Sequence, residues 1–228
     1  AGGLGAPGRA GPPAAVTAQD AAYIVREAAQ AMTRSQSDRV EFLQEAFYST
    51  GTKASGYLEA WIYQDRSSAW VYSADRQLEL RSWTATAHGT VTTTTVDYST
   101  RSWSRTAQPA TPPPSGNCAI RREATGRPVP VPVPQLLACG TFVIAGHDDI
   151  AGVNAVKLTG TGAGARPWVT TVWVSPSTYL AVRLTTSHRG ERINQSDFRW
   201  LAPEPGTVNK LGAPQIPAGF RHLPSRPG

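Results

Sequence analysis

The side chains in this sequence that could perform acid–base or metal chemistry are its histidines and carboxylates, and their spacing favours neither. The chain has four histidines: His88, His147, His188 and His222. None has the H-x-x-x-H or H-E-x-x-H spacing that places two metal ligands on one helix face. His147, Asp148 and Asp149 could together hold a cation, but this acidic segment between glycines is more typical of a turn. The sequence therefore predicts no metal site.

Motifs of known catalytic and nucleotide-binding sites do not occur in the sequence. There is no G-x-S-x-G elbow, P-loop or G-x-G-x-x-G, and the glycine-rich residues 160–165 lack the lysine and the helix that phosphate binding needs. The sequence Asn194-Gln195-Ser196 matches a glycosylation sequon, a three-residue pattern that recurs by chance. We predict a non-catalytic protein without a cofactor. A hydrolase remains an alternative, because catalytic groups can be brought together from distant parts of a chain.

The only two cysteines, Cys118 and Cys139, flank a proline-rich segment. They do not form the C-x-x-C pair of a redox or zinc motif. We predict that they form a disulfide, which would contribute about 3 kcal/mol for a loop of this length in the chain-entropy model. A disulfide places the protein outside the cytoplasm. The alternative is a pair of free, buried thiols.

The charge of the chain limits its partners. The 22 Lys and Arg residues and 16 Asp and Glu residues give a net charge of +6, and no run of four or more basic residues occurs. A nucleic-acid partner is therefore not expected. A moderate attraction to an anionic membrane surface is compatible with this charge. No run of about 18 apolar residues could span a bilayer, so any signal or membrane anchor would lie outside these residues.

The longest helical pattern covers residues 17–36. Thr17 and Asp20 have capping-box-like spacing, and apolar residues from Ala21 to Met32 recur three or four positions apart. Because no second strong helix is visible, this amphipathic helix is expected to bury its apolar stripe in the concave face of a sheet. Residues 1–16 are rich in glycine, alanine and proline, and predict a flexible tether.

Short runs with alternating or β-branched residues, separated by turn signals, predict about eleven strands. They cover residues 38–48, 57–63, 69–73, 77–85, 90–98, a short strand near 103, 141–146, 153–160, 168–174, 179–187 and 192–201. Prolines at 109–134 exclude a central strand there and predict an irregular excursion. The expected fold is mainly β (α+β), a curved antiparallel sheet or incomplete β-barrel wrapped around the N-terminal helix. One domain would span residues 17–220, with a tail at 221–228.

Several stretches resemble a known superfamily. They are TVWVSPSTYLAVRL at 171–184, VDYSTRSW at 96–103, FRWL at 198–201 and IPAGF at 216–220. With the order of helix, six-strand meander, excursion and five strands, they resemble the LolA/LolB-like lipoprotein-carrier superfamily, including its LppX- and LprG-like members. The resemblance implies an incomplete barrel around an apolar groove that accepts acyl chains. The proline-rich excursion with its two cysteines and the single clear helix depart from the family pattern.

The strands themselves support such a groove. In residues 57–63 both alternate sets of side chains are apolar, and a sheet that is apolar on both faces must cover both or leave one open to a ligand. A groove left open and a core filled completely by helix and excursion are both compatible with the composition. The residues we predict to line the groove are Ile24, Val25, Met32, Phe42, Trp61, Trp70, Trp83 and Trp173.

We therefore predict an extracytoplasmic protein, secreted or anchored to the outer face of the membrane, that binds a lipid or acylated molecule. The alternative is the extracytoplasmic sensor or interaction domain of a single-pass membrane protein, such as an anti-sigma factor, with a membrane-bound partner protein. In that case the tether at residues 1–16 would link the domain to a membrane helix that precedes it in the sequence.

Overall fold

A computed structural model describes residues 18–49, 52–110, 132–161 and 168–224. The helix α1 (Ala18–Asp38) begins within the predicted helix and ends two residues beyond it. Ala21, Ala28 and Met32 form its buried stripe, with exposed fractions of 2% or less. The predicted amphipathic helix is therefore confirmed. The predicted tether at residues 1–16 lies outside the described residues.

The rest of the chain is mainly β, as predicted. The strands are β1 (Val40–Phe47), β2 (Gly56–Tyr63), β3 (Arg66–Ser73), β4 (Leu78–Ala87), β5 (Thr90–Asp97), β6 (Ser102–Pro109), β7 (Thr141–Ile150), β8 (Val153–Thr161), β9 (Trp168–Val174), β10 (Ala181–His188), β11 (Glu191–Leu201) and β12 (Arg221–His222). Eleven of them lie where the sequence predicts strands. The two-residue β12 was not expected, and it places residues that we predicted as tail within the sheet.

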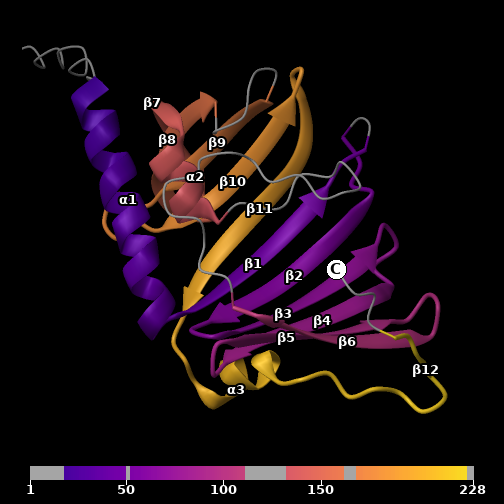
Figure 1. The fold of residues 1–228 in the computed structure, drawn as a ribbon. Helices are drawn as coiled ribbons and strands as arrows, with labels where there is room; N and C mark the ends of the chain where they lie inside the picture. The colour runs from indigo at the N-terminus through magenta and orange to yellow at the C-terminus, as the bar shows by residue number, and fades with distance from the viewer. Residues whose placement is uncertain (1–17, 50–51, 111–131, 162–167, 225–228) are drawn as a thin grey trace, which may run out of the picture.

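All twelve strands belong to one curved sheet in the order β12-β6-β5-β4-β3-β2-β1-β11-β10-β9-β8-β7 (Figure 1). Neighbouring strands pair antiparallel except β12 and β6, which are parallel. The sheet does not close, because β7 and β12 are its two ends. The central pair, β1 and β11, joins two halves, β2–β6 and β7–β10.

Three hairpin turns show why the strands reverse where they do. His88–Gly89, Ala151–Gly152 and Arg189–Gly190 each have two consecutive residues with positive φ, from 50° to 86°. Two positive φ angles define the type I′ turn, whose twist matches the twist of the flanking strands. Glycine takes the second position at no steric cost. These dipeptides therefore determine the register of β4 with β5, β7 with β8 and β10 with β11.

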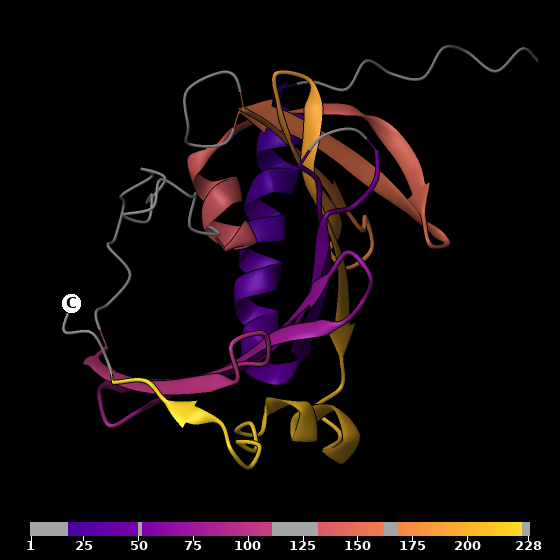
Figure 2. The same ribbon diagram turned by 90° about the vertical axis from the view of Figure 1, so that its right-hand side faces the viewer.

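Helices cover the inner, concave face of the sheet in the half formed by β7–β11 (Figures 1 and 2). The apolar stripe of α1 and the short helix α2 (Val133–Cys139) pack there with side chains of all five strands. The buried members of this inner core are Ala28, Ala31, Met32, Val133, Leu137, Phe142, Val156, Leu158, Val172, Val174, Leu180, Ala181, Leu184 and Phe198. The predicted arrangement of helix within a curved sheet is therefore confirmed.

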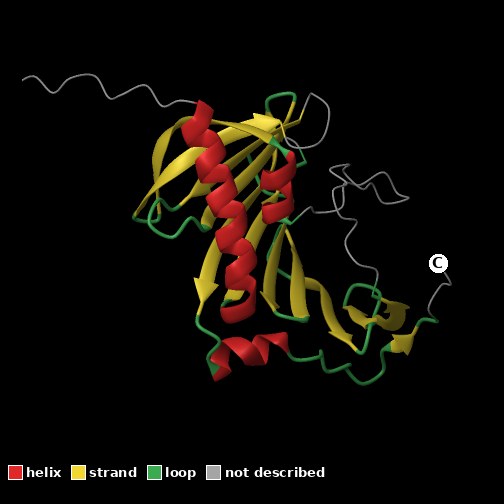
Figure 3. Cartoon of the chain, turned by 60° about the vertical axis from the view of Figure 1, so that its left-hand side comes forward, coloured by secondary structure: helices red, strands yellow, loops and turns green. Residues whose placement is uncertain are grey.

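The C-terminal segment covers part of the outer face. After β11 the chain forms α3 (Pro205–Val208) and the 3₁₀ helix η1 (Asn209–Leu211), which lie below the sheet in Figure 3. Leu211 is 1% exposed and packs with Val40 and Trp61. The indole nitrogen of Trp83 donates a hydrogen bond to the Leu211 carbonyl at 2.7 Å. Beyond η1, β12 pairs with β6, so that the tail also covers one sheet edge.

We expect Met32→Ala to lower the free energy of unfolding by about 2–5 kcal/mol, because it empties a fully buried site between α1 and the sheet. Urea unfolding measures the change. The matched control on the same helix is Gln30→Ala, which alters an exposed side chain and should change stability by less than about 0.5 kcal/mol. Equal effects of the two substitutions would contradict the packing of α1 described above.

Candidate functional site

The inner face of β2–β4 carries apolar side chains that remain half-buried. Leu43 of β1 belongs to the inner side because it packs with the core that contains α1. Residues that lie opposite one another in the sheet register, or two positions apart on one strand, face the same side of the sheet. Four apolar residues of β2–β4 share the side of Leu43 in this way, and we call them the inner apolar patch: Leu58, Ala69, Val71 and Leu80. All four are half-buried. Most contacts of α1 with the sheet are with β7, and fewer are with β2 and β1, so α1 covers β7 more closely than the strands of this patch.

Two carboxylates lie on the same inner face of β1. Glu45 accepts a hydrogen bond of 2.6 Å from the Asn194 side-chain amide, and Glu41 is only 8% exposed. Burial raises the pKa of Glu45 to about 7, although hydrogen bonds from Asn194 and Ser196 act in the opposite direction. Burial likewise raises the pKa of Glu41, opposed by a hydrogen bond with Gln36. Such perturbed carboxyl groups are more frequent at functional sites than elsewhere.

Three of the eight predicted lining residues lie on this inner side of the sheet. Met32 is fully buried in the core between α1 and β7–β11, and Ile24 and Val25 pack against that core. They therefore fill the concavity of one half of the sheet. The structure does not place them next to the five aromatic residues that we predicted to line the groove with them.

The other five predicted lining residues lie on the outer face. Phe42 and Trp61 are opposite each other in the register of β1 and β2, and they pack with Trp70 and with Leu211 of η1. Because Phe42 alternates with the inner-facing Leu43, this aromatic cluster lies on the other side of the sheet from α1. Trp83 joins it through its hydrogen bond to Leu211. The structure therefore does not bring all eight residues to one face of the sheet. The composition of β2 showed two apolar faces but not which of them meets the helix.

The outer aromatic residues have partners of their own. The rings of Phe42 and Trp61 are 5.0 Å apart, and those of Trp61 and Trp70 are 5.1 Å apart. The Lys210 ammonium lies 5.2 Å from the centroid of the Trp70 ring. Trp173 donates a hydrogen bond to Asp148 at 2.8 Å. These contacts identify them as packing residues of the outer layer.

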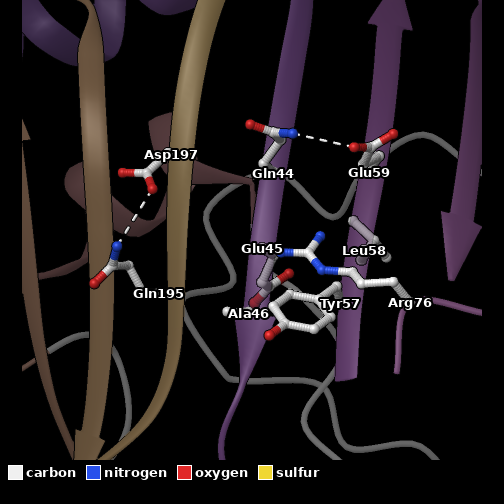
Figure 4. A pocket seen from close by; sticks show the side chains of 9 residues that line it. All are labelled: Gln44, Glu45, Ala46, Tyr57, Leu58, Glu59, Arg76, Gln195 and Asp197. Atoms are coloured by element: carbon white, nitrogen blue, oxygen red, sulfur yellow. Dashed lines mark hydrogen bonds between the residues drawn. The ribbon is translucent and has the colours of Figure 1, made fainter. Parts of the chain in front are cut away.

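A polar pocket of about 160 Å³ opens on the outer face between β11, β1 and β2 (Figure 4). The guanidinium of Arg76 stacks 3.3 Å from the centroid of the Tyr57 ring, and Gln44 donates a hydrogen bond to Glu59 at 3.1 Å. Asp197 accepts a hydrogen bond from Gln195 at 3.3 Å and pairs with Arg183. Because its polar groups bind one another, this pocket does not suit an acyl chain.

The residues singled out for chemistry have structural roles. Asp149 accepts a hydrogen bond of 3.0 Å from the Gly152 amide, and Asp148 pairs with Lys157 at 3.2 Å, so the acidic segment next to His147 stabilises its hairpin. Across the described ranges, no group of three or more His, Cys, Asp or Glu side chains could hold a metal ion. Asn194 of the sequon is a half-buried strand residue. Sequence reasoning did not identify Glu45, because nothing local to a strand shows that its carboxyl group is buried.

The predicted disulfide has one cysteine in the described part of the chain. Cys139 ends α2 and is not a free thiol. Cys118 lies outside the described residues, so its bond to Cys139 stays a prediction.

Replacement of Glu45 by Gln should change the pH dependence of stability. The folded-state pKa of about 7 exceeds the ordinary value of 4.5, so Glu45 costs the fold nothing below pH 4.5, destabilises it increasingly as the pH rises from 4.5 to 7, and has its full destabilising effect above pH 7. The free energy of unfolding of the wild type should therefore fall relative to that of Glu45→Gln by up to about 3 kcal/mol over this range. Urea unfolding from pH 4.5 to pH 8 measures this difference.

The exposed Glu79→Gln is the matched control, and its stability profile should follow that of the wild type. If the wild type and Glu45→Gln kept a constant difference over this pH range, Glu45 could not be a buried, titrating group.

No protein-family model and no curated protein matches this chain. Solved structures do match it. An uncharacterized conserved protein from Thermus thermophilus is 8% identical with a TM-score of 0.50, over 88% of this chain and 98% of that one. The lipoprotein LppX of Mycobacterium tuberculosis is 14% identical with a TM-score of 0.50, over 82% of this chain and 98% of LppX.

A chain of the Pseudomonas aeruginosa MucA/MucB complex is 16% identical with a TM-score of 0.46, over 86% of this chain and 63% of that one. At such identities a match shows the fold alone. The curved open sheet, the helix α1 in its concavity and the match to LppX agree with the resemblance noted in the sequence. This chain has the fold of the LolA/LolB-like lipoprotein carriers.

Proposed function

We propose that this protein binds the acyl chain of a lipid or acylated molecule on the inner face of β2–β4, beside the core that contains α1. The observation that carries the proposal is the inner apolar patch of Leu58, Ala69, Val71 and Leu80, which lies on the concave side of the sheet and is only half-buried. An apolar surface on a concave face is where a ligand can displace water most effectively.

The energetics allow firm binding. Each methylene transferred from water to an apolar environment contributes about 0.8 kcal/mol, so a chain of twelve carbons gains about 10 kcal/mol before ordering costs are subtracted. The patch contains no charged side chain among its four members. A non-catalytic carrier needs no further chemistry than this surface, which is consistent with the absence of catalytic motifs from the sequence.

We further propose an extracytoplasmic location, in line with the fold and with the predicted disulfide between Cys118 and Cys139. No helix among the described residues is long and apolar enough to cross a membrane. The net charge of +6 would favour approach to an anionic membrane surface from which a lipid is taken or to which it is delivered.

Native mass spectrometry of the protein purified from its own host tests the proposal. We expect a stoichiometric adduct with the mass of a lipid or acylated molecule, which organic extraction and lipid analysis would identify. A protein that carries nothing and stays apo after incubation with host lipids would contradict the carrier function. That result would favour the alternative of a sensor or interaction domain with a protein partner.

A pair of lysine substitutions on β4 tests the location of the ligand. Leu80→Lys places a charge on the inner patch and should lower lipid occupancy about tenfold or more. The matched control, Ala85→Lys, adds the same charge at a half-buried position on the outer face and should leave occupancy unchanged. Circular dichroism measures the folded fraction of each variant, and lipid occupancy is compared at equal folded fractions. Equal loss of lipid in the two variants would place the ligand elsewhere.

A thiol titration tests the disulfide. In the unfolded protein without reductant, we expect no reactive sulfhydryl, and two after reduction. Two reactive sulfhydryls before reduction would show that Cys118 and Cys139 are free and would remove one support for an extracytoplasmic location.

A further inference from the structure

Two acidic side chains lie next to the inner apolar patch, Glu45 at one end and Asp97 of β5, opposite Leu80, at the other. Asp97 accepts hydrogen bonds from Ser99 at 2.6 Å and from the Thr100 amide at 2.9 Å. In the sheet register Glu45 lies opposite Ser196 of β11 on one side and Leu58 of β2 on the other. Leu58 in turn lies opposite Val71, and Val71 opposite Leu80. One row of the inner face therefore begins with the carboxyl group of Glu45, continues with three apolar side chains and reaches Asp97 of β5. This is the order of groups that an acyl chain with a polar end would require.

The surroundings of Glu45 leave its charge uncompensated. Its hydrogen-bond partners, Asn194 and Ser196, are both neutral. On its own strand the other inner-facing charged group is Glu41, which has the same sign and bonds to Gln36. On β2 the inner-facing neighbours are the apolar Leu58, Ala60 and Ile62.

On β11 the nearest cation along the chain is Arg192, which turns away from Glu45. Its guanidinium donates a hydrogen bond to Gln195 at 3.2 Å and lies 5.6 Å from the centroid of the Tyr48 ring. Within the described part of the chain, the elements next to Glu45 therefore offer it neutral donors and a like charge.

A carboxylate has about four acceptor positions on its two oxygens, and Asn194 and Ser196 occupy two of them. A ligand that donates a hydrogen bond would complete this set, and hydrogen bonds to a charged acceptor are the strong ones. A ligand that ends in a carboxylate would instead meet a like charge in a desolvated site.

Building on the proposed function, we propose that Glu45 is the specificity-determining residue of the lipid site. It would bind the polar end of acylated molecules that donate a hydrogen bond there, such as a hydroxyl or an amide, and reject those that end in a carboxylate. Because burial raises the pKa of Glu45 to about 7, the rejection should be strong above this pH and weaker below it.

If Glu45 had only a structural role, its substitution would have a different effect on ligand binding. Asn194, which donates to Glu45, accepts a hydrogen bond of 3.0 Å from the Thr186 amide next to the irregularity in the pairing of β10 with β11, where Ile193 is the extra residue. Glu45 could therefore serve only to orient Asn194 at this irregularity. The substitution Glu45→Gln keeps an oxygen that can accept from Asn194 but removes the titrating charge. It separates the two roles.

The test compares two probes with the same twelve-carbon acyl chain, 1-monolauroylglycerol and laurate, below their micelle-forming concentrations. Isothermal titration calorimetry of the full chain at pH 6 and pH 8 gives their affinities. At pH 8 the wild type should bind 1-monolauroylglycerol about tenfold more tightly than laurate, and this preference should shrink at pH 6. Glu45→Gln should show the same small preference at both pH values. Glu79→Gln, the matched control at an exposed carboxyl group, should keep the behaviour of the wild type.

The outcomes distinguish the two proposals. If both probes bind without the pH-dependent preference, the role of Glu45 in specificity is overturned while the acyl-binding site stands. If neither probe binds, the site itself is overturned and the role of Glu45 with it. If Glu45→Gln keeps the pH-dependent preference, the selecting group lies elsewhere and the assignment to Glu45 is wrong.

Discussion

The structure depends on one constraint: the central strands of the sheet are apolar on both faces, so both faces must be covered. Alternation along β1 sends Leu43 to the side of α1 and Phe42 to the side of η1. On the inner side the cover is the apolar stripe of α1 with α2, and on the outer side it is the segment around Leu211. The long helix and the C-terminal segment therefore have the same effect on opposite faces, because each removes apolar area of the sheet from water.

The two halves of the sheet satisfy this requirement to different degrees. In β7–β11 the inner residues Leu158, Val172 and Val174 are fully buried by the helices. In β2–β4 the corresponding positions, such as Val71 and Leu80, stay half-buried. The inner residues of β7–β11 are thus covered by protein, whereas β2–β4 keep apolar surface that is partly exposed. The difference between the two parts of the sheet is the structural basis for the proposal that an acyl chain binds on β2–β4.

Polar groups follow the same division. The outer face is dense in pairs that satisfy one another, such as Arg183 with Asp197 and Lys157 with Asp148. On the inner face Glu45 is held by neutral donors alone. A buried carboxyl group without a cation is costly to the fold, and such costs are retained most often where a site needs them. The outer ion pairs therefore need no functional explanation, whereas Glu45 does.

The sequence by itself determined the elements of this protein, α1 and the positions of eleven strands, because both depend on local periodicity and backbone preference. It also determined, through the resemblance of its hairpin at 171–184, the type of fold. Only the tertiary structure decided which alternate set of each strand meets α1. A period of two shows that Trp61 and Ile62 point to opposite faces but not which face is concave, and for this reason the sequence did not show that the aromatic residues lie on the face opposite α1. The burial of Glu45 was likewise decided by strands distant in the sequence, because Asn194 and Ser196 reach β1 only through the pairing of β1 with β11.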